Sequence, residues 1–136
     1  MNEMLKVTDN SVEPWREIGS DWAEGLPAGW QGILKQLNTG LVILKRRDPE
    51  FQFEIGQLKE KFGALRIYYS FSHKTDDTKL KDLLSSLVDW AEWISAHTCN
   101  VCGEIATKQS RGGWVAPWCD KCWEENRSGE NYTKLG

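Results

Sequence analysis

Two matched cysteine pairs decide the fold of the C-terminal region: Cys99-Asn100-Val101-Cys102 and Cys119-Asp120-Lys121-Cys122. Sixteen residues separate the pairs, a spacing typical of four-cysteine zinc sites. A gap of two residues lets one tight turn direct both sulfurs at a single ion about 2.3 Å away. The intervening segment can fold back as a hairpin and bring the two turns together. We therefore expect a zinc ribbon over residues 98–125.

Three other uses of the cysteines compete with zinc. Two disulfides would need an oxidising compartment, whereas Met1–Asn10 lacks the apolar segment of a signal peptide, so we expect a cytoplasmic protein. A thioredoxin-like redox pair uses one Cys-x-x-Cys motif rather than two. Iron accepts a similar spacing and stays open as the alternative metal. Because four thiolates leave no coordination position for water, we expect one structural Zn²⁺ on Cys99, Cys102, Cys119 and Cys122.

Upstream of the cysteines, the apolar periodicity predicts an α+β core over residues 11–97. Ile33, Leu37 and Leu41 follow a helical spacing, whereas Phe53 and Ile55 alternate with polar residues as in a strand. Gly56 interrupts this alternation and indicates a bulge. The expected elements are a flexible arm over 1–10, helices at about 12–24, 30–47 and 77–97, strands at about 51–58 and 64–71, and a flexible tail over 126–136. The predicted fold is α+β, with helices packed on a small antiparallel sheet and a C-terminal zinc ribbon.

The two strands form a plausible hairpin with one apolar and one basic face. We expect the apolar side chains to face the core; these are Phe62, Leu65, Ile67 and Tyr69. The other face would carry Lys59, Lys61 and Arg66 together with Tyr68, which can stack on a partner. A solvated face is the simpler interpretation of these charges, and partner binding is the alternative.

The order of these motifs resembles a family of small uncharacterised proteins from bacteria and their phages. The matching residues are Gly29-Trp30, the segment Lys59-Glu60-Lys61-Phe62-Gly63-Ala64-Leu65-Arg66-Ile67-Tyr68-Tyr69, the two cysteine pairs and Gly113-Trp114-Val115. Members pair a ribbon of the form KEKFGxLRxYY with a C-terminal four-cysteine zinc ribbon. The resemblance covers about residues 29–123. It implies the fold and no particular activity.

The charge balance of the sequence disfavours nucleic-acid binding as the function. The 136 residues include 17 Lys and Arg against 20 Asp and Glu, a formal net charge of −3. Zn²⁺ and four thiolates together add about two further negative charges. Non-specific nucleic-acid binding depends chiefly on neutralising phosphates, so this balance disfavours it. A nucleic-acid-associated zinc ribbon remains the alternative function.

Catalytic motifs are missing from the sequence. Its two histidines are His73, in a polar stretch, and His97, beside the first cysteine pair. There is no nucleophile elbow, phosphate-binding glycine loop or deaminase motif. We therefore expect a protein that is not an enzyme.

Eight tryptophans favour a protein-binding function. Trp and Tyr dominate protein interfaces because they bury a large area at low entropic cost. We expect Trp15, Trp22, Trp30 and Trp90 in the core, and Trp114, Trp118 and Trp123 at a partner surface, because a zinc ribbon is too small to bury three indoles. An acidic cytoplasmic protein of this size fits an immunity or inhibitor protein that neutralises a basic bacterial toxin or a defence factor.

Overall fold

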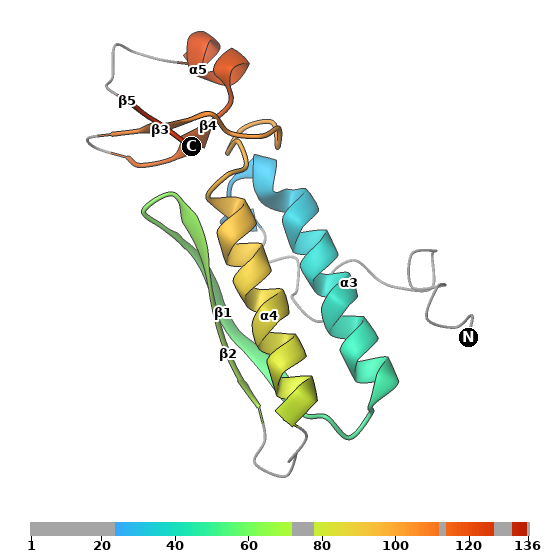
Figure 1. Ribbon diagram of the computed structural model, residues 1–136. Helices are drawn as coiled ribbons and strands as arrows, with labels where there is room; N and C mark the ends of the chain where they lie inside the picture. Colours follow the sequence, from blue (N-terminus) through green and yellow to red (C-terminus); the bar gives the residue numbers. More distant parts are fainter. Residues whose placement is uncertain (1–23, 72–77, 112–113, 127–131, 136) are drawn as a thin grey trace.

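The computed structural model describes residues 24–71, 78–111, 114–126 and 132–135. Its architecture is α+β, as expected: an antiparallel helix pair covers a two-stranded hairpin, and a four-cysteine ribbon lies at one end (Figure 1). The expected arm over 1–10 and nearly all of the expected helix over 12–24 lie outside the described residues, and so do Trp15 and Trp22.

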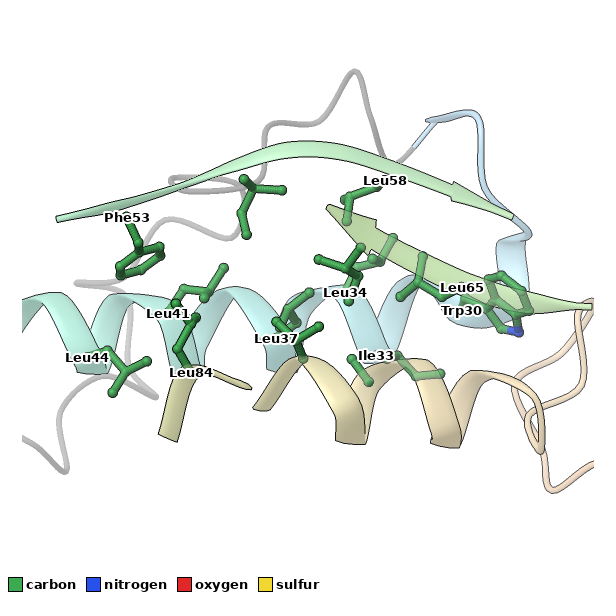
Figure 2. Packing of buried hydrophobic residues seen from close by; sticks show 14 of the residues in the cluster. Trp30, Ile33, Leu34, Leu37, Leu41, Leu44, Phe53, Leu58, Leu65 and Leu84 are labelled. Atoms are coloured by element: carbon green, nitrogen blue, oxygen red, sulfur yellow. The ribbon is translucent and has the colours of Figure 1, made fainter. Parts of the chain in front are cut away.

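Two long helices build one side of the core. They are α3 (Gln31–Arg47), which follows the short 3₁₀ helix η2 (Ala28–Trp30), and α4 (Thr78–Ser95). The apolar stripe of α3 packs between α4 and the hairpin, where its leucines are almost completely buried (Figure 2). Trp30 lies at the ribbon end of this core and is fully buried.

The two tryptophans of α4 differ in exposure. Trp90 is half-buried against the core, but 62% of Trp93 is exposed. The buried face of α4 includes Val88, Ala91 and Ser95. Trp93 follows Ala91 by two residues, about 200° around the helix, and therefore lies on the opposite side.

The hairpin consists of β1 (Phe53–Lys61) and β2 (Ala64–Phe71). The pairing register shifts between Ile55 and Gln57, which confirms the bulge predicted at Gly56. Lys61 pairs with Ala64, so the turn contains only Phe62 and Gly63. Both residues have positive φ, 55° and 82°, as in a type I′ turn.

The position of Phe62 differs from the sequence-based expectation. We expected its ring in the core, but it lies at the tip of the turn and is 70% exposed. The alternation of the strands cannot continue through a two-residue turn, since both turn residues leave the pleated sheet. The left-handed backbone conformation at this position is also unfavourable for a bulky residue.

Replacing Phe62 by asparagine should therefore stabilise the protein. Asn-Gly is a preferred sequence for this turn, and the Phe62 ring contributes little core packing. We expect the free energy of unfolding to rise by about 0.5–1 kcal/mol in urea titrations. A loss of stability of that size would show that the exposed ring has an important packing role.

The outer edge of β2 is protected by side chains of α4 rather than by a third strand. The backbone N–H of Leu65 donates to Ser95 Oγ at 2.8 Å, and that of Ile67 donates to Glu92 Oε2 at 2.8 Å. The Ser95 hydroxyl in turn donates to the carbonyl of Glu92. This arrangement fixes the hairpin against α4 and satisfies backbone groups that an isolated two-stranded ribbon would leave exposed.

Replacing Ser95 by alanine should test this anchor. Ser95 is fully buried, so the variant leaves the N–H of Leu65 without its acceptor in the protein interior. We expect a destabilisation of about 1–3 kcal/mol, measured by thermal or urea unfolding. Cysteine at the same position should recover only part of that loss, because sulfur is a weak acceptor. An unchanged stability of Ser95→Ala would contradict the anchoring role.

The C-terminal ribbon is a small three-stranded sheet with one helix. The central strand β3 (Lys108–Ser110) pairs with β4 (Pro117–Trp118) on one side and with β5 (Tyr132–Lys134) on the other, and α5 (Asp120–Asn126) follows β4. The strand β5 corrects the expectation of a flexible tail over 126–136. Polar side chains suggested no structure there, but backbone pairing with β3 does not require apolar ones.

Candidate metal centre

All four cysteines converge on one point. Their sulfurs lie within 4.8 Å of one another, and Cys102 Sγ is 3.6 Å from Cys119 Sγ. A tetrahedron with metal–sulfur bonds of about 2.3 Å has edges of about 3.8 Å, close to this separation. A disulfide would need about 2.05 Å, and all four thiols are free. The arrangement is thus positioned to hold a metal ion with sulfur ligands only.

Each cysteine pair is shaped by a tight turn. In the first, the N–H of Gly103 donates to the carbonyl of Cys99 at 3.1 Å, and Gly103 adopts a φ of 85° that favours glycine. The N–H of Glu104 approaches Cys102 Sγ at 3.5 Å. In the second, the N–H of Cys122 approaches Cys119 Sγ at 3.4 Å as α5 begins. Such N–H···S contacts stabilise thiolates and orient them towards the ion.

Without a metal, the pKa values of the Cys99 and Cys122 thiols are shifted in opposite directions. Burial raises the pKa of Cys99, but the backbone N–H groups of Cys102, Cys119 and Val101 outweigh it and bring the pKa down to about 7. Burial and the neighbouring thiols raise the pKa of Cys122 far above its ordinary value. Only part of the cluster is therefore ionised at neutral pH. Since metal ligation requires thiolates, binding should release protons and weaken as the pH falls.

The cysteine cluster is joined to the α+β core through η2. The N–H of Gly29 donates to the carbonyl of Asn100 at 2.9 Å, and the indole N–H of Trp30 donates to the carbonyl of Thr98 at 3.1 Å. A Cβ atom on Gly29 would lie 2.0 Å from the carbonyl oxygen of Cys99. Because Gly29 has no side chain, the first cysteine turn can pack directly against the core at this point. Local sequence patterns do not indicate this role, because Gly29 and Cys99 lie about 70 residues apart.

Comparison of the chain with models of protein families, with curated proteins and with solved structures found no match. None of the helices in the described residues is long and apolar enough to cross a membrane.

The three tryptophans expected at a partner surface have different environments. Trp114 is 72% exposed, whereas Trp123 is 4% exposed. Trp118 is half-buried against the cysteine cluster, and its buried indole N–H has no hydrogen-bond partner among the residues that the structure describes. Of the three, only Trp114 offers a large accessible ring.

The burial of Trp123 is a correction with a clear cause. Its ring packs edge-on against Trp118, with centroids 5.9 Å apart, and against Tyr132 of β5 at 5.2 Å. The ammonium of Lys108 lies over the ring of Tyr132 and forms a 2.5 Å ion pair with Asp120. The expectation assumed that the ribbon ended near residue 125, so it omitted the strand that covers Trp123.

The residues of the expected basic face do lie together on the hairpin. Lys59 pairs directly across from Arg66, and Lys59 lies 5.4 Å above the ring of Tyr68, which is 47% exposed. Lys61 follows at the turn, above Phe62. Like charges directly opposite one another weaken a strand pair, so this face contributes little to the stability of the fold.

Proposed function

We propose that the protein is a non-enzymatic protein-binding module whose C-terminal ribbon is held by one structural Zn²⁺. The observation that carries the metal assignment is the convergence of four cysteine sulfurs with no other donor type among them. Zinc suits this set because it favours tetrahedral thiolate coordination, and iron is the competing ion. A closed four-sulfur shell leaves no position for a substrate.

A protein partner is supported by exposed aromatic rings near the ribbon. Trp114 and Phe62 are 72% and 70% exposed, and aromatic side chains of this size contribute strongly to protein interfaces. Neither ring contributes to the core clusters. The formal net charge of −3, lowered further by the zinc–thiolate centre, would attract a basic partner.

Within this class we favour an immunity or inhibitor protein that neutralises a basic bacterial toxin or defence factor. The proposal rests on small size, negative charge and exposed aromatic residues, all of which suit a protein that blocks another by binding. It is tested by affinity capture of the zinc-loaded full chain from the source cell, followed by reconstitution with the purified captured protein. A stoichiometric complex that loses the partner's toxic activity supports it. A protein that forms no such complex contradicts it.

The alternative function, nucleic-acid association, is favoured by one observation. Lys59, Arg66 and Tyr68 combine positive charge with an exposed ring on the same hairpin face, as single-strand binders do. A titration with single-stranded RNA at two salt concentrations distinguishes the two. Micromolar affinity that falls steeply with salt would favour this alternative.

A further inference from the structure

We propose that the edge of β1 that pairs with no other described strand, together with the exposed Trp114, binds an extended segment of a partner protein, which adds a strand to the hairpin. This inference rests on the proposed protein-binding function and specifies how the partner docks. Strand addition obtains affinity from backbone hydrogen bonds and specificity from side-chain pockets.

The hydrogen-bond pattern of the hairpin identifies the free groups. Leu65 and Ile67 donate their N–H groups to α4, so the backbone groups of both residues face away from β1. Their partners across the ladder are Glu60 and Leu58. In an antiparallel pair such residues have N–H and C=O groups directed outward on both strands. Within the described chain, no hydrogen bond beyond the hairpin reaches the outward backbone groups of Leu58 or Glu60.

A groove of about 620 Å³ lies along this edge. Leu58 and Glu60 form one side, Leu26 and Pro27 belong to the segment before η2, and Trp114 of the ribbon also lines it. Its volume is in the range of natural ligand sites, and the free strand edge favours an extended peptide. The hairpin tip approaches the ribbon in Figure 1, consistent with a groove built from both units.

The backbone at Trp114 is held by a buried serine. Ser110 Oγ donates to the carbonyl of Trp114 at 2.9 Å and accepts the N–H of Ala116 at 3.0 Å. The backbone that carries the exposed indole is thus held in place, which lowers the entropic cost of ordering this loop on binding. Because Trp114 belongs to the ribbon, the metal centre should control the shape of the groove.

The charged side chains of the groove lining indicate which kind of partner segment fits the groove. The groove lining carries the carboxylates of Glu24 and Glu60 and the side chain of Lys59. The ammonium of Lys59 lies over the ring of Tyr68, and Glu60 Oε2 accepts the N–H of Gly63 at 2.8 Å. The lining therefore favours an occupant with an apolar side chain for Trp114 and a neighbouring basic side chain for the carboxylates. The overall negative charge acts in the same direction.

A library of random twelve-residue peptides displayed on phage provides the probe. The zinc-loaded full chain is the target, and enriched peptides are synthesised and titrated against it. We expect sequences with alternating apolar and basic residues. In NMR hydrogen exchange on the unmodified protein, a bound peptide should increase the protection of the Leu58 and Glu60 amides by about tenfold or more.

Two matched pairs of variants separate the contacts. Trp114→Ala should weaken peptide binding at least tenfold, whereas Trp93→Ala, which removes another exposed indole outside the groove, should not. Glu60→Pro and Glu60→Ala both remove the carboxylate, but only proline also removes the outward N–H. We expect the proline variant to bind about fivefold more weakly than the alanine variant.

Each outcome decides the inference. Peptides that are lost with Trp114→Ala and that protect the Leu58 amide support it. No enrichment, or binding insensitive to both Trp114→Ala and Glu60→Pro, overturns it. A concentration-dependent dimer that Glu60→Pro converts to monomer also overturns it, by assigning the edge to a second copy. If a reconstituted partner binds Trp114→Ala and Glu60→Pro as tightly as the unmodified protein, that result contradicts strand addition at β1 and leaves the proposed protein-binding function intact.

Discussion

Replacing Cys122 by serine should abolish metal binding and unfold the C-terminal ribbon. Cys122 is buried among the other three sulfurs, and a metal with three thiolates lacks one vertex of its tetrahedron. Metal binding contributes on the order of 10–16 kcal/mol in zinc-finger peptides, far more than the few apolar contacts around this cluster can replace. The expected result is a chain without stoichiometric metal, cleaved by trypsin after Lys108 and beyond.

We expect the α+β core to stay folded in Cys122→Ser, so that the loss of structure is confined to the ribbon. Helices α3 and α4 share their own apolar cluster with the hairpin, so the helical circular dichroism should persist with a lowered melting temperature. Val101→Ser is the matched control, because residue 101 lies in the first cysteine turn, is 43% exposed and provides no ligand. Val101→Ser should retain one metal ion. A folded, protease-resistant ribbon in Cys122→Ser without metal would contradict a structural metal centre.

Replacing Gly29 by alanine should detach the ribbon from the core. The new Cβ would lie 2.0 Å from the carbonyl oxygen of Cys99 and 2.8 Å from the nitrogen of Gly103. Both are backbone atoms of the turn that holds Cys99 and Cys102, so the clash cannot be relieved by rotating a side chain. Overpacking typically costs 1–3 kcal/mol, and contact with backbone this close should reach at least the upper part of that range.

Gly32→Ala is the control for Gly29→Ala. Nothing lies within 4 Å of a Cβ on Gly32, which belongs to α3, so alanine should raise stability by up to about 1 kcal/mol. Differential scanning calorimetry of both zinc-loaded variants measures the contrast. If Gly29→Ala melts like the unmodified protein, the ribbon does not dock through η2 as described.

Local patterns in the sequence were sufficient to predict much of the fold. The spacing of Ile33, Leu37 and Leu41 predicts α3, and the slip in alternation at Gly56 predicts the bulge, because both depend on a few neighbouring residues. The cysteine cluster could also be predicted from the sequence, since the spacing of two Cys-x-x-Cys turns indicates which four side chains converge.

Features that depend on distant segments could not be predicted in this way. Tyr132 covers Trp123 only because β5 pairs with β3 across a long connection. Gly29 resembles any turn glycine until Cys99 is placed beside it. The groove combines residues near positions 26, 58 and 114, and its free edge follows from hydrogen bonds between β2 and α4. Tertiary contacts, rather than local preferences, determine all three.

Native mass spectrometry of the full chain, purified without added metal or reductant, tests whether the four cysteines hold one metal ion. We expect one zinc ion per chain, retained in gentle ionisation and lost with proton uptake when the solution is acidified. The four cysteines should resist alkylation while the metal is bound. A metal-free chain whose mass shows two disulfides, one within each pair or between pairs, would contradict the account.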